Sequence, residues 1–248
     1  VGYTYHDVSQ YNKETAGVQD RFGIMFFCLT YFSLISLSSL PLWRDEVRIF
    51  IHERASGAYG TLAYYAATVL CDVAPFRIVP PMLFTLVSYP TVGLAGGGRW
   101  TTFMTILILF NLVSSSLCML MGLLSGSNAV ANAAGSLLML FSLLFAGYLK
   151  NVAHFPSGWK LGAYLSPSFY AYNALVKNEL ETVDGLYITA VVGDIKETAG
   201  PFDGTTMLHC FSLGQDSITY DATVLLSMFG AILGAIFLVM AFVLRENR

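Results

Sequence analysis

Hydrophobic residues occur along this chain in long runs that short polar segments separate. A membrane-spanning helix needs about 20 mostly apolar residues, and five runs approach or exceed that length. They are Phe22–Leu42, Phe76–Gly93, Thr101–Leu124, Val130–Leu149 and Ala222–Leu244. The alternating pattern of a membrane β-barrel is absent from these runs. The chain is therefore expected to be an all-α membrane protein, a polytopic helical bundle.

The second run is the least regular, because Pro80, Pro81 and Pro90 interrupt it. A moderately apolar helix over Leu62–Asp72 precedes it. Pro75 is expected to kink or restart the helix between the two, since proline lacks the backbone N–H that a helix interior requires.

The segment Arg44–Arg54 is dense in charge, although only 12% of all residues are charged. A membrane protein keeps such a cluster outside the lipid. We expect a compact amphipathic unit that links the first two spans and that another domain can push.

Two later segments are less apolar. Pro156–Val176 is amphipathic and aromatic, which suits a re-entrant or interfacial pair of helices. Residues 177–220 form a polar loop. The last span carries Gly230-x-x-x-Gly234, a weak motif for a helix-packing face.

Composition agrees with a multi-pass membrane protein, since 55% of residues are hydrophobic and the mean hydropathy is +0.61. A net charge of −3 without a basic stripe argues against a nucleic-acid partner. His52-Glu53 is not followed by a second histidine at metal-ligand spacing. We therefore assign no catalytic residues and no metal site.

Arginine placement indicates the orientation. Arg44, Arg48 and Arg54 lie between the first two spans, and the tail adds Arg245 and Arg248, whereas the short loop on the other side has Arg99. Positive residues favour the cytoplasmic side, so the charged segment and the C-terminus are expected there. The chain opens at Val1, and we expect an N-terminal part to be missing.

Cys28, Cys71 and Cys118 lie in or beside spans and are expected to behave as small hydrophobes. Cys210 lies in the polar loop, where it either pairs with a second chain or remains a free thiol. Asp72 and Arg77 are the strongly ionisable residues expected near membrane depth, where charge is costly. They stand about 140° apart round an ideal helix, and both are also able to snorkel to the interface.

Five segments in order carry a resemblance to one family. They are Gly17–Phe27, Arg48–Tyr59, Asp72–Pro80, Phe145–Asn151 and Tyr170–Leu180. The chain resembles the transmembrane domain of the G subfamily of ATP-binding cassette transporters, the White and breast-cancer-resistance type.

The resemblance implies a bundle of the type-two ABC exporter kind with about five spans present of six. The expected organisation begins with an exterior loop at 1–20, a span at 22–42, a cytoplasmic coupling segment at 44–59 and a kinked helix and span at 61–95. It continues with spans at 100–124 and 130–149, re-entrant helices at 156–176, an exterior loop at 177–220 and a span at 221–244.

The resemblance also implies partners that composition does not reveal. A nucleotide-binding domain with ATP and Mg²⁺ would precede the missing first span, and a second half transporter would complete a homo- or heterodimer in the plasma membrane. Hydrophobic or amphipathic molecules, such as lipids, sterols or xenobiotics, would be exported. This chain has no Gly-x-x-x-x-Gly-Lys-Ser/Thr phosphate loop, so no cofactor is expected in it. A permease with a separate ATPase subunit is an alternative, and a membrane enzyme or receptor is a more distant one.

The resemblance implies that the charged segment couples to the nucleotide-binding domain. The residues expected to make this contact are Glu46, Phe50, His52, Glu53 and Tyr59. An ordinary solvated loop is the alternative interpretation. Substituting Glu53 or Phe50 is expected to uncouple ATP hydrolysis from transport without abolishing folding.

The substrate path is expected between the second and fifth spans of the family, where helix-packing core is the alternative. The residues expected on the first wall are Phe27, Tyr31, Leu34 and Ile35, and those expected on the other wall are Ser136, Leu140 and Leu143. Tyr148 and Leu149 stand where the family has an exit gate. Tyr31 and Leu34 replace an amide and a stacking aromatic of the multidrug member, and Arg77 matches a position that affects its substrate choice.

Overall fold

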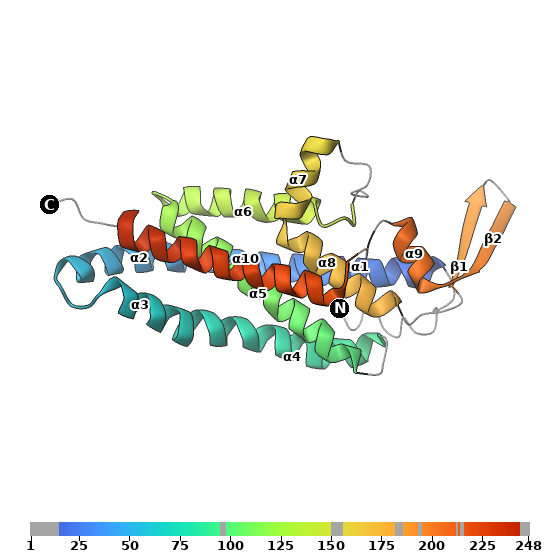
Figure 1. Ribbon diagram of the computed structural model, residues 1–248, viewed down its shortest axis with the longest axis horizontal. Helices are drawn as coiled ribbons and strands as arrows, with labels where there is room; N and C mark the ends of the chain where they lie inside the picture. The colour runs from blue at the N-terminus through green and yellow to red at the C-terminus, as the bar shows by residue number, and fades with distance from the viewer. Residues whose placement is uncertain are drawn as a thin grey trace.

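The computed structural model describes residues 15–94, 98–149, 156–181, 186–192, 195–211, 213 and 216–243. Four helical stretches within them are long and apolar enough to cross a membrane. They are Gly17–Ala55, Thr61–Val92, Arg99–Leu124 and Ile218–Phe242. The predicted helical membrane bundle is confirmed, with one small two-stranded hairpin added to it (Figure 1).

The bundle is elongated, and its elements run mostly along one axis (Figure 1). The elements are α1 (Thr15–Leu37), α2 (Leu40–Ala55), α3 (Thr61–Ala67), α4 (Ala74–Val92), α5 (Arg99–Leu124), α6 (Asn128–Leu144), α7 (Ser157–Leu165), α8 (Pro167–Leu180), β1 (Leu186–Val192), β2 (Ile195–Phe202), α9 (Gly204–Cys210) and α10 (Ile218–Leu238). The turn between α2 and α3 and the end of α10 lie at one end of the molecule, whereas α9 and the hairpin lie at the other.

Helix α5 is the central element of the bundle. It packs against α1, α2, α4, α6, α8 and α10. Its side chains Leu107, Phe110 and Val113 are fully buried, as expected for a helix that is apolar on all sides. The other spans are arranged around it.

The charged segment is helical. Helix α1 ends at Leu37, and α2 begins at Leu40 after two intervening residues, with Pro41 in the first turn where a missing N–H is harmless. Trp43, Val47 and Phe50 are buried at helical spacing, whereas Arg48 and Glu53 are exposed. The predicted amphipathic unit is confirmed, although the expected span at 22–42 is divided between two helices.

The expected kink at Pro75 takes the form of a change in helix type. A π-helical turn over Thr68–Val73 leads directly into α4, and Pro75 lies in the first turn of α4. Such a turn relaxes the i to i−4 ladder that proline cannot complete.

A second proline in α4 is compensated from outside the helix. Pro81 has no N–H to donate to the Arg77 carbonyl one turn earlier. The buried Asn111 of α5 donates its Nδ2 to this carbonyl at 2.7 Å. A polar side chain in the central helix thus completes the backbone hydrogen bonding of its neighbour.

The expected span at 130–149 is shorter than predicted. Helix α6 ends at Leu144 and has 17 residues, which corresponds to about 25 Å. The chain then turns, and Gly147 adopts a φ of 99°, a left-handed conformation that favours glycine. The apolar run continues past this turn, which is why hydrophobicity alone overestimated the helix.

The expected re-entrant helices and exterior loop also have different bounds. Helices α7 and α8 form the pair, but α8 continues to Leu180 rather than ending at residue 176. Segment 177–220 contains an antiparallel hairpin of β1 and β2 and the short helix α9. Serine hydroxyls attach the pair to α6, since Ser142 Oγ lies 2.7 Å from Ser168 Oγ and Ser166 Oγ donates to the Ser142 carbonyl.

Close helix packing occurs at different glycines from those of the predicted motif. A Cβ added to Gly230 or Gly234 would meet nothing within 4 Å, whereas one on Gly122 would lie 3.1 Å from Trp43 Cβ. At Gly135 it would lie 2.5 Å from the Leu40 side chain. Small residues on α5 and α6 therefore allow α2 to approach.

We predict that Gly122→Val lowers stability by about 1–3 kcal/mol, because a branched side chain forces α2 away from α5. The thermal unfolding midpoint in detergent measures this effect. Gly230→Val is the matched control, since the same substitution there meets open space. Equal midpoints for the two variants would contradict the proposed close approach.

Candidate functional site

An aromatic cluster holds the connection between α2 and α3 together. The ring of Phe50 lies 4.7 Å from that of Tyr64, and the stacked rings of Tyr59 and Tyr64 are 5.4 Å apart. Phe50 is fully buried. We call the segment from α2 through α3, with this cluster, the α2–α3 corner. It is a rigid unit, because aromatic pairs add to the stabilisation from buried area.

Two tyrosine hydroxyls bind two carboxylates across the corner. Tyr59 donates to Glu53 Oε2 at 2.5 Å, and Tyr64 donates to Glu46 Oε2 at 2.8 Å. Burial, the hydrogen bond to Glu53 and the charge of nearby carboxylates raise the pKa of Tyr59 to about 12. Tyr59 is thus a neutral donor at physiological pH, and it orients the Glu53 carboxylate.

The corner is bound to other helices through their backbone carbonyls. Arg54 donates to the carbonyls of Met240 and Ala241 at 2.7 and 3.3 Å, near the end of the last helix. The last carbonyls of a helix lack intrahelical donors and attract a cation. Arg44 donates in turn to the Gly126 carbonyl between α5 and α6 at 2.9 Å.

The structure brings together four of the five predicted coupling residues. Glu46, Phe50, Glu53 and Tyr59 meet in the corner, whereas His52 is exposed on the same helix. Phe50 corrects one expectation: its ring is a core side chain, so truncating it costs about 3–5 kcal/mol in stability and does not spare folding. Sequence reasoning missed Tyr64 and Arg54 as members of the site, because their partners are distant carbonyls and a carboxylate 18 residues away.

The first wall of the expected substrate path lies on α1. Phe27, Tyr31 and Leu34 are exposed and Ile35 is half-buried, so they share a solvent- or lipid-accessible face. The ring of Tyr31 stacks on Phe84 of α4 at 5.5 Å. These residues share one face of α1, as the periodicity predicts, and Phe84 of α4 contacts this face.

The second wall, on α6, differs from the prediction. Leu140 is exposed and Ser136 is half-buried, but Leu143 is buried in the main core. The exposed residues nearby include Leu137, Phe141 and Leu144. The accessible face is therefore rotated round the helix from the predicted one. The sequence is apolar on both faces, so its pattern does not fix the rotation.

The expected exit gate lies just beyond α6. Leu149 is exposed, and the ring of Tyr148 stacks on Phe26 at 4.7 Å with an interplanar angle of 24°. Tyr148 also contacts Tyr172 of α8 edge-on at 6.1 Å. Tyr148 thus joins α1 to α8.

Three other residues singled out from the sequence, Asp72, Arg77 and Cys210, are not among the side chains described in the corner, the walls or the exit gate. The side chains of Asp72 and Cys210 lie outside the part of the chain that is described. Arg77 is half-buried, and its carbonyl accepts the hydrogen bond from Asn111 described above. Arg77 therefore contributes to the structure through its backbone.

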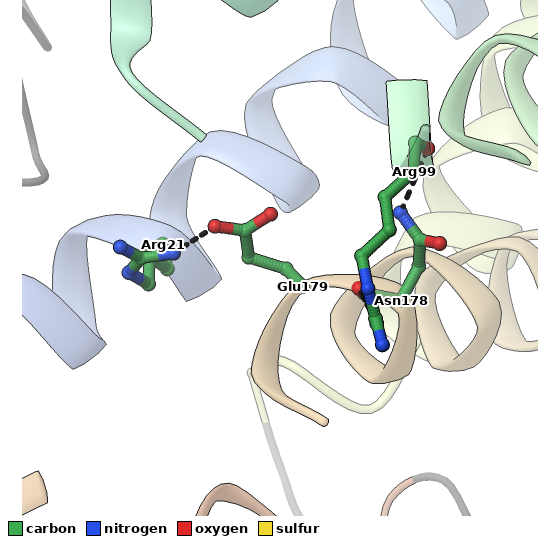
Figure 2. A network of polar contacts seen from close by, with 4 residues as sticks. All are labelled: Arg21, Arg99, Asn178 and Glu179. Carbon is green, nitrogen blue, oxygen red and sulfur yellow. Dashed lines mark hydrogen bonds and ion pairs between the residues drawn. The ribbon is translucent and has the colours of Figure 1, made fainter. Parts of the chain in front are cut away.

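An ionic network at the other end of the molecule was not predicted. The guanidinium of Arg21 on α1 pairs with Glu179 on α8, and both side chains are almost completely buried. Beside it, Arg99 donates to the Asn178 carbonyl, and Asn178 Nδ2 donates back to the Arg99 carbonyl at 3.2 Å (Figure 2). The network joins α1, α5 and α8. Arg21, Asn178 and Glu179 lie in two of the motif segments and Arg99 lies in none, and nothing in the local sequence indicates that these segments meet.

We predict that Glu179→Gln destabilises the protein by about 3–5 kcal/mol, because it leaves the Arg21 charge buried without its counter-ion. Glu181→Gln is the control on the same helix, because Glu181 is exposed and lies 3.8 Å from Arg99. Its effect should stay within about 0.5 kcal/mol. Thermal unfolding of both variants provides the measurement, and a stable Glu179→Gln protein would show that the pair is dispensable.

Comparison with known proteins places this arrangement in a family. The family model described as ABC-2 type transporter matches residues 1–180. The chain is 31% identical over 248 residues to a probable ATP-dependent permease of Saccharomyces cerevisiae, covering 98% of this chain and 22% of that protein. It is 33% identical over 234 residues to ABC transporter G family member 24 of Dictyostelium discoideum, covering 94% of this chain and 20% of that protein.

A third relative is the broad substrate specificity ATP-binding cassette transporter of Bos taurus. It is 31% identical over 183 residues, which is 72% of this chain and 27% of that protein. The chain thus spans about a fifth to a quarter of the length of these curated relatives. Because the family model covers residues 1–180 and the relatives align across most of the chain, the chain belongs to the ABC-2 type transporter family, as a G-type transmembrane domain.

Proposed function

We propose that this chain is the membrane-spanning half of an ATP-driven exporter of hydrophobic or amphipathic molecules. The observation that carries the proposal is the α2–α3 corner. It has the rigidity, the exposed carboxylate of Glu53 and the attachment to other helices that a lever requires.

The corner is suited to transmit a push into several helices at once. Its aromatic cluster fixes α2 relative to α3, and these helices lead into α1 and α4. Tyr65 attaches the corner to α10 through the Leu233 carbonyl at 3.1 Å, and Arg54 attaches it to the π-helical turn Val239–Val243 that continues α10. A movement of the corner would therefore move the wall on α1 together with the last helix.

The push would come from a nucleotide-binding domain that binds ATP and Mg²⁺, on the same polypeptide or on a separate subunit. The names of the relatives support this partner, since they describe an ATP-dependent permease and an ATP-binding cassette transporter. A second half transporter would supply the opposite side of the path. The exposed apolar faces of α1 and α6 are the surfaces that such a partner would enclose.

The orientation follows from the same reasoning. The arginine-rich corner and the end of α10 lie at one end of the bundle, which supports a cytoplasmic location for both. The ionic network, α9 and the hairpin would then lie toward the exterior. We assign the protein to the plasma membrane as part of this proposal.

The first test is to replace Glu53 with glutamine in the full-length protein. Loss of the carboxylate charge should reduce transport severalfold more than ATP hydrolysis, because the exposed contact that couples the two is weakened while the corner keeps its core. Parallel assays of dye transport and phosphate release in vesicles measure the ratio.

Asp45→Asn is the control for this test, since Asp45 is an exposed carboxylate on the same helix outside the aromatic cluster. It should leave the ratio of transport to hydrolysis unchanged. An unchanged ratio for Glu53→Gln would remove Glu53 from the coupling contact.

A second test concerns the substrate wall. The double variant Leu34→Ala and Leu140→Ala should raise the KM for a hydrophobic fluorescent dye severalfold, because it removes apolar contact area from both sides of the path. Basal ATP hydrolysis should stay unchanged. Leu226→Ala provides the control, as Leu226 is an exposed leucine on α10. A KM equal to that of the unsubstituted protein would place the path elsewhere.

A further inference from the structure

A cavity of about 380 Å³ lies at the end of the bundle that carries the ionic network. Its walls come from the start of α1, the turn after α6, α8 and the region of α9. Val18, Phe22, Met207 and Leu213 provide apolar surface. Both the volume and the apolar lining are those of small-molecule sites, which use few polar groups to orient a ligand.

One side chain in the cavity wall has an unsatisfied polar atom. Tyr172 is fully buried, and its hydroxyl has no hydrogen-bond partner among the residues that the structure describes. A buried donor without an acceptor costs about 1–3 kcal/mol. The other tyrosine of α8, Tyr170, differs in this respect, because its hydroxyl donates to the Tyr164 carbonyl at 3.0 Å.

The ring that carries this hydroxyl is held in place. Tyr172 packs edge-on against Tyr148, and Tyr148 stacks on Phe26 of α1. The rings of Tyr148 and Tyr172 thus form one side of the cavity, and Phe26 packs against Tyr148. A donor fixed in this way loses little conformational entropy when it binds a ligand.

We propose that this cavity binds an uncharged, apolar molecule that carries a hydrogen-bond acceptor, with the Tyr172 hydroxyl as the donor. Among the lining residues that the structure describes, none is formally charged, which favours an uncharged ligand over an ionic one. The cavity adjoins Tyr148 at the expected exit. The inference rests on the proposed export function in one respect. If the protein is an exporter, the chemical class of this ligand is also the class of the molecules that leave past Tyr148.

A second cavity of about 320 Å³ provides an internal comparison. It lies between α5, α6 and α10 and includes Ser142 and Ser166 in its lining. Their hydroxyls lie 3.0 Å apart and bond with one another. This second cavity therefore should not distinguish a ligand with an acceptor from one without.

The test uses benzophenone and 1,1-diphenylethylene, two uncharged molecules of closely similar shape. The ketone oxygen of benzophenone accepts a hydrogen bond, and the CH₂ group of the alkene does not. Binding is measured by competition against radiolabelled benzophenone, with the protein in lipid nanodiscs and without ATP. We expect the ketone to bind about fivefold more tightly than the alkene, as one net hydrogen bond allows.

Irradiation then locates the site, because excited benzophenone inserts into nearby C–H bonds. Labelled peptides should contain Met207 or the start of α1. Labelling confined to α5, α6 or α10 would assign binding to the second cavity and overturn the proposal.

Tyr172→Phe should abolish the preference for the ketone while leaving alkene binding unchanged. Without ligand, the variant should be at least as stable as the original, since it removes a buried hydroxyl that has no partner in the described structure. Tyr170→Phe is the matched control and should keep the preference. The two probes also partition into the lipid of the nanodisc. This partitioning is the same for every variant, so it does not affect a comparison of the ketone preference between variants.

The proposal is overturned if Tyr172→Phe retains the fivefold preference, or if it lowers the unfolding midpoint of the ligand-free protein, as a structural hydrogen bond would require. This binding test needs neither ATP nor transport. It therefore fails or succeeds independently of the coupling test on Glu53.

Discussion

Hydrogen bonding of the backbone inside the bundle is the constraint on which this structure depends. Lipid offers no donors or acceptors, so every buried peptide group must find its partner within the protein. Helix α4, which contains four prolines, is the severest case. A π-helical turn accommodates Pro75, and Asn111 of α5 donates to the carbonyl that Pro81 leaves without a donor. These two compensations allow an irregular helix to lie beside the central one.

The same chemistry is used where helices must be attached to one another. Arg54 binds carbonyls near the end of the last helix, Arg44 binds the Gly126 carbonyl, and hydroxyls of Ser142, Ser166 and Ser168 join α6 to the start of α8. At the opposite end a buried pair, Arg21 and Glu179, joins α1 to α8. Polar contacts thus join the helices at both ends of the bundle, and apolar side chains pack between these ends.

Sequence reasoning succeeded in placing the main segments. In α2 the density of charged residues predicted an amphipathic unit, although Phe50 was assigned to coupling and its ring lies in the core. In α1 the exposed row of Phe27, Tyr31 and Leu34 was also predicted. It failed for the rotation of α6, where large apolar residues such as Leu137 are exposed and Ser142 is buried, so Leu143 was assigned to the wall although it lies in the core. It also overextended α6, because the turn at Gly147 follows from its backbone conformation and not from hydrophobicity.

The sequence by itself determined the class of the protein, the approximate position of each helix and the amphipathic corner, because these depend on composition and on period along one segment. Only the tertiary structure decided that Arg21 meets Glu179, that Asn111 completes α4, and that Tyr172 lines a cavity with an unpartnered hydroxyl. Each of these features joins residues that are remote in sequence. Their meeting depends on how the helices pack, which a pattern read along one helix does not contain.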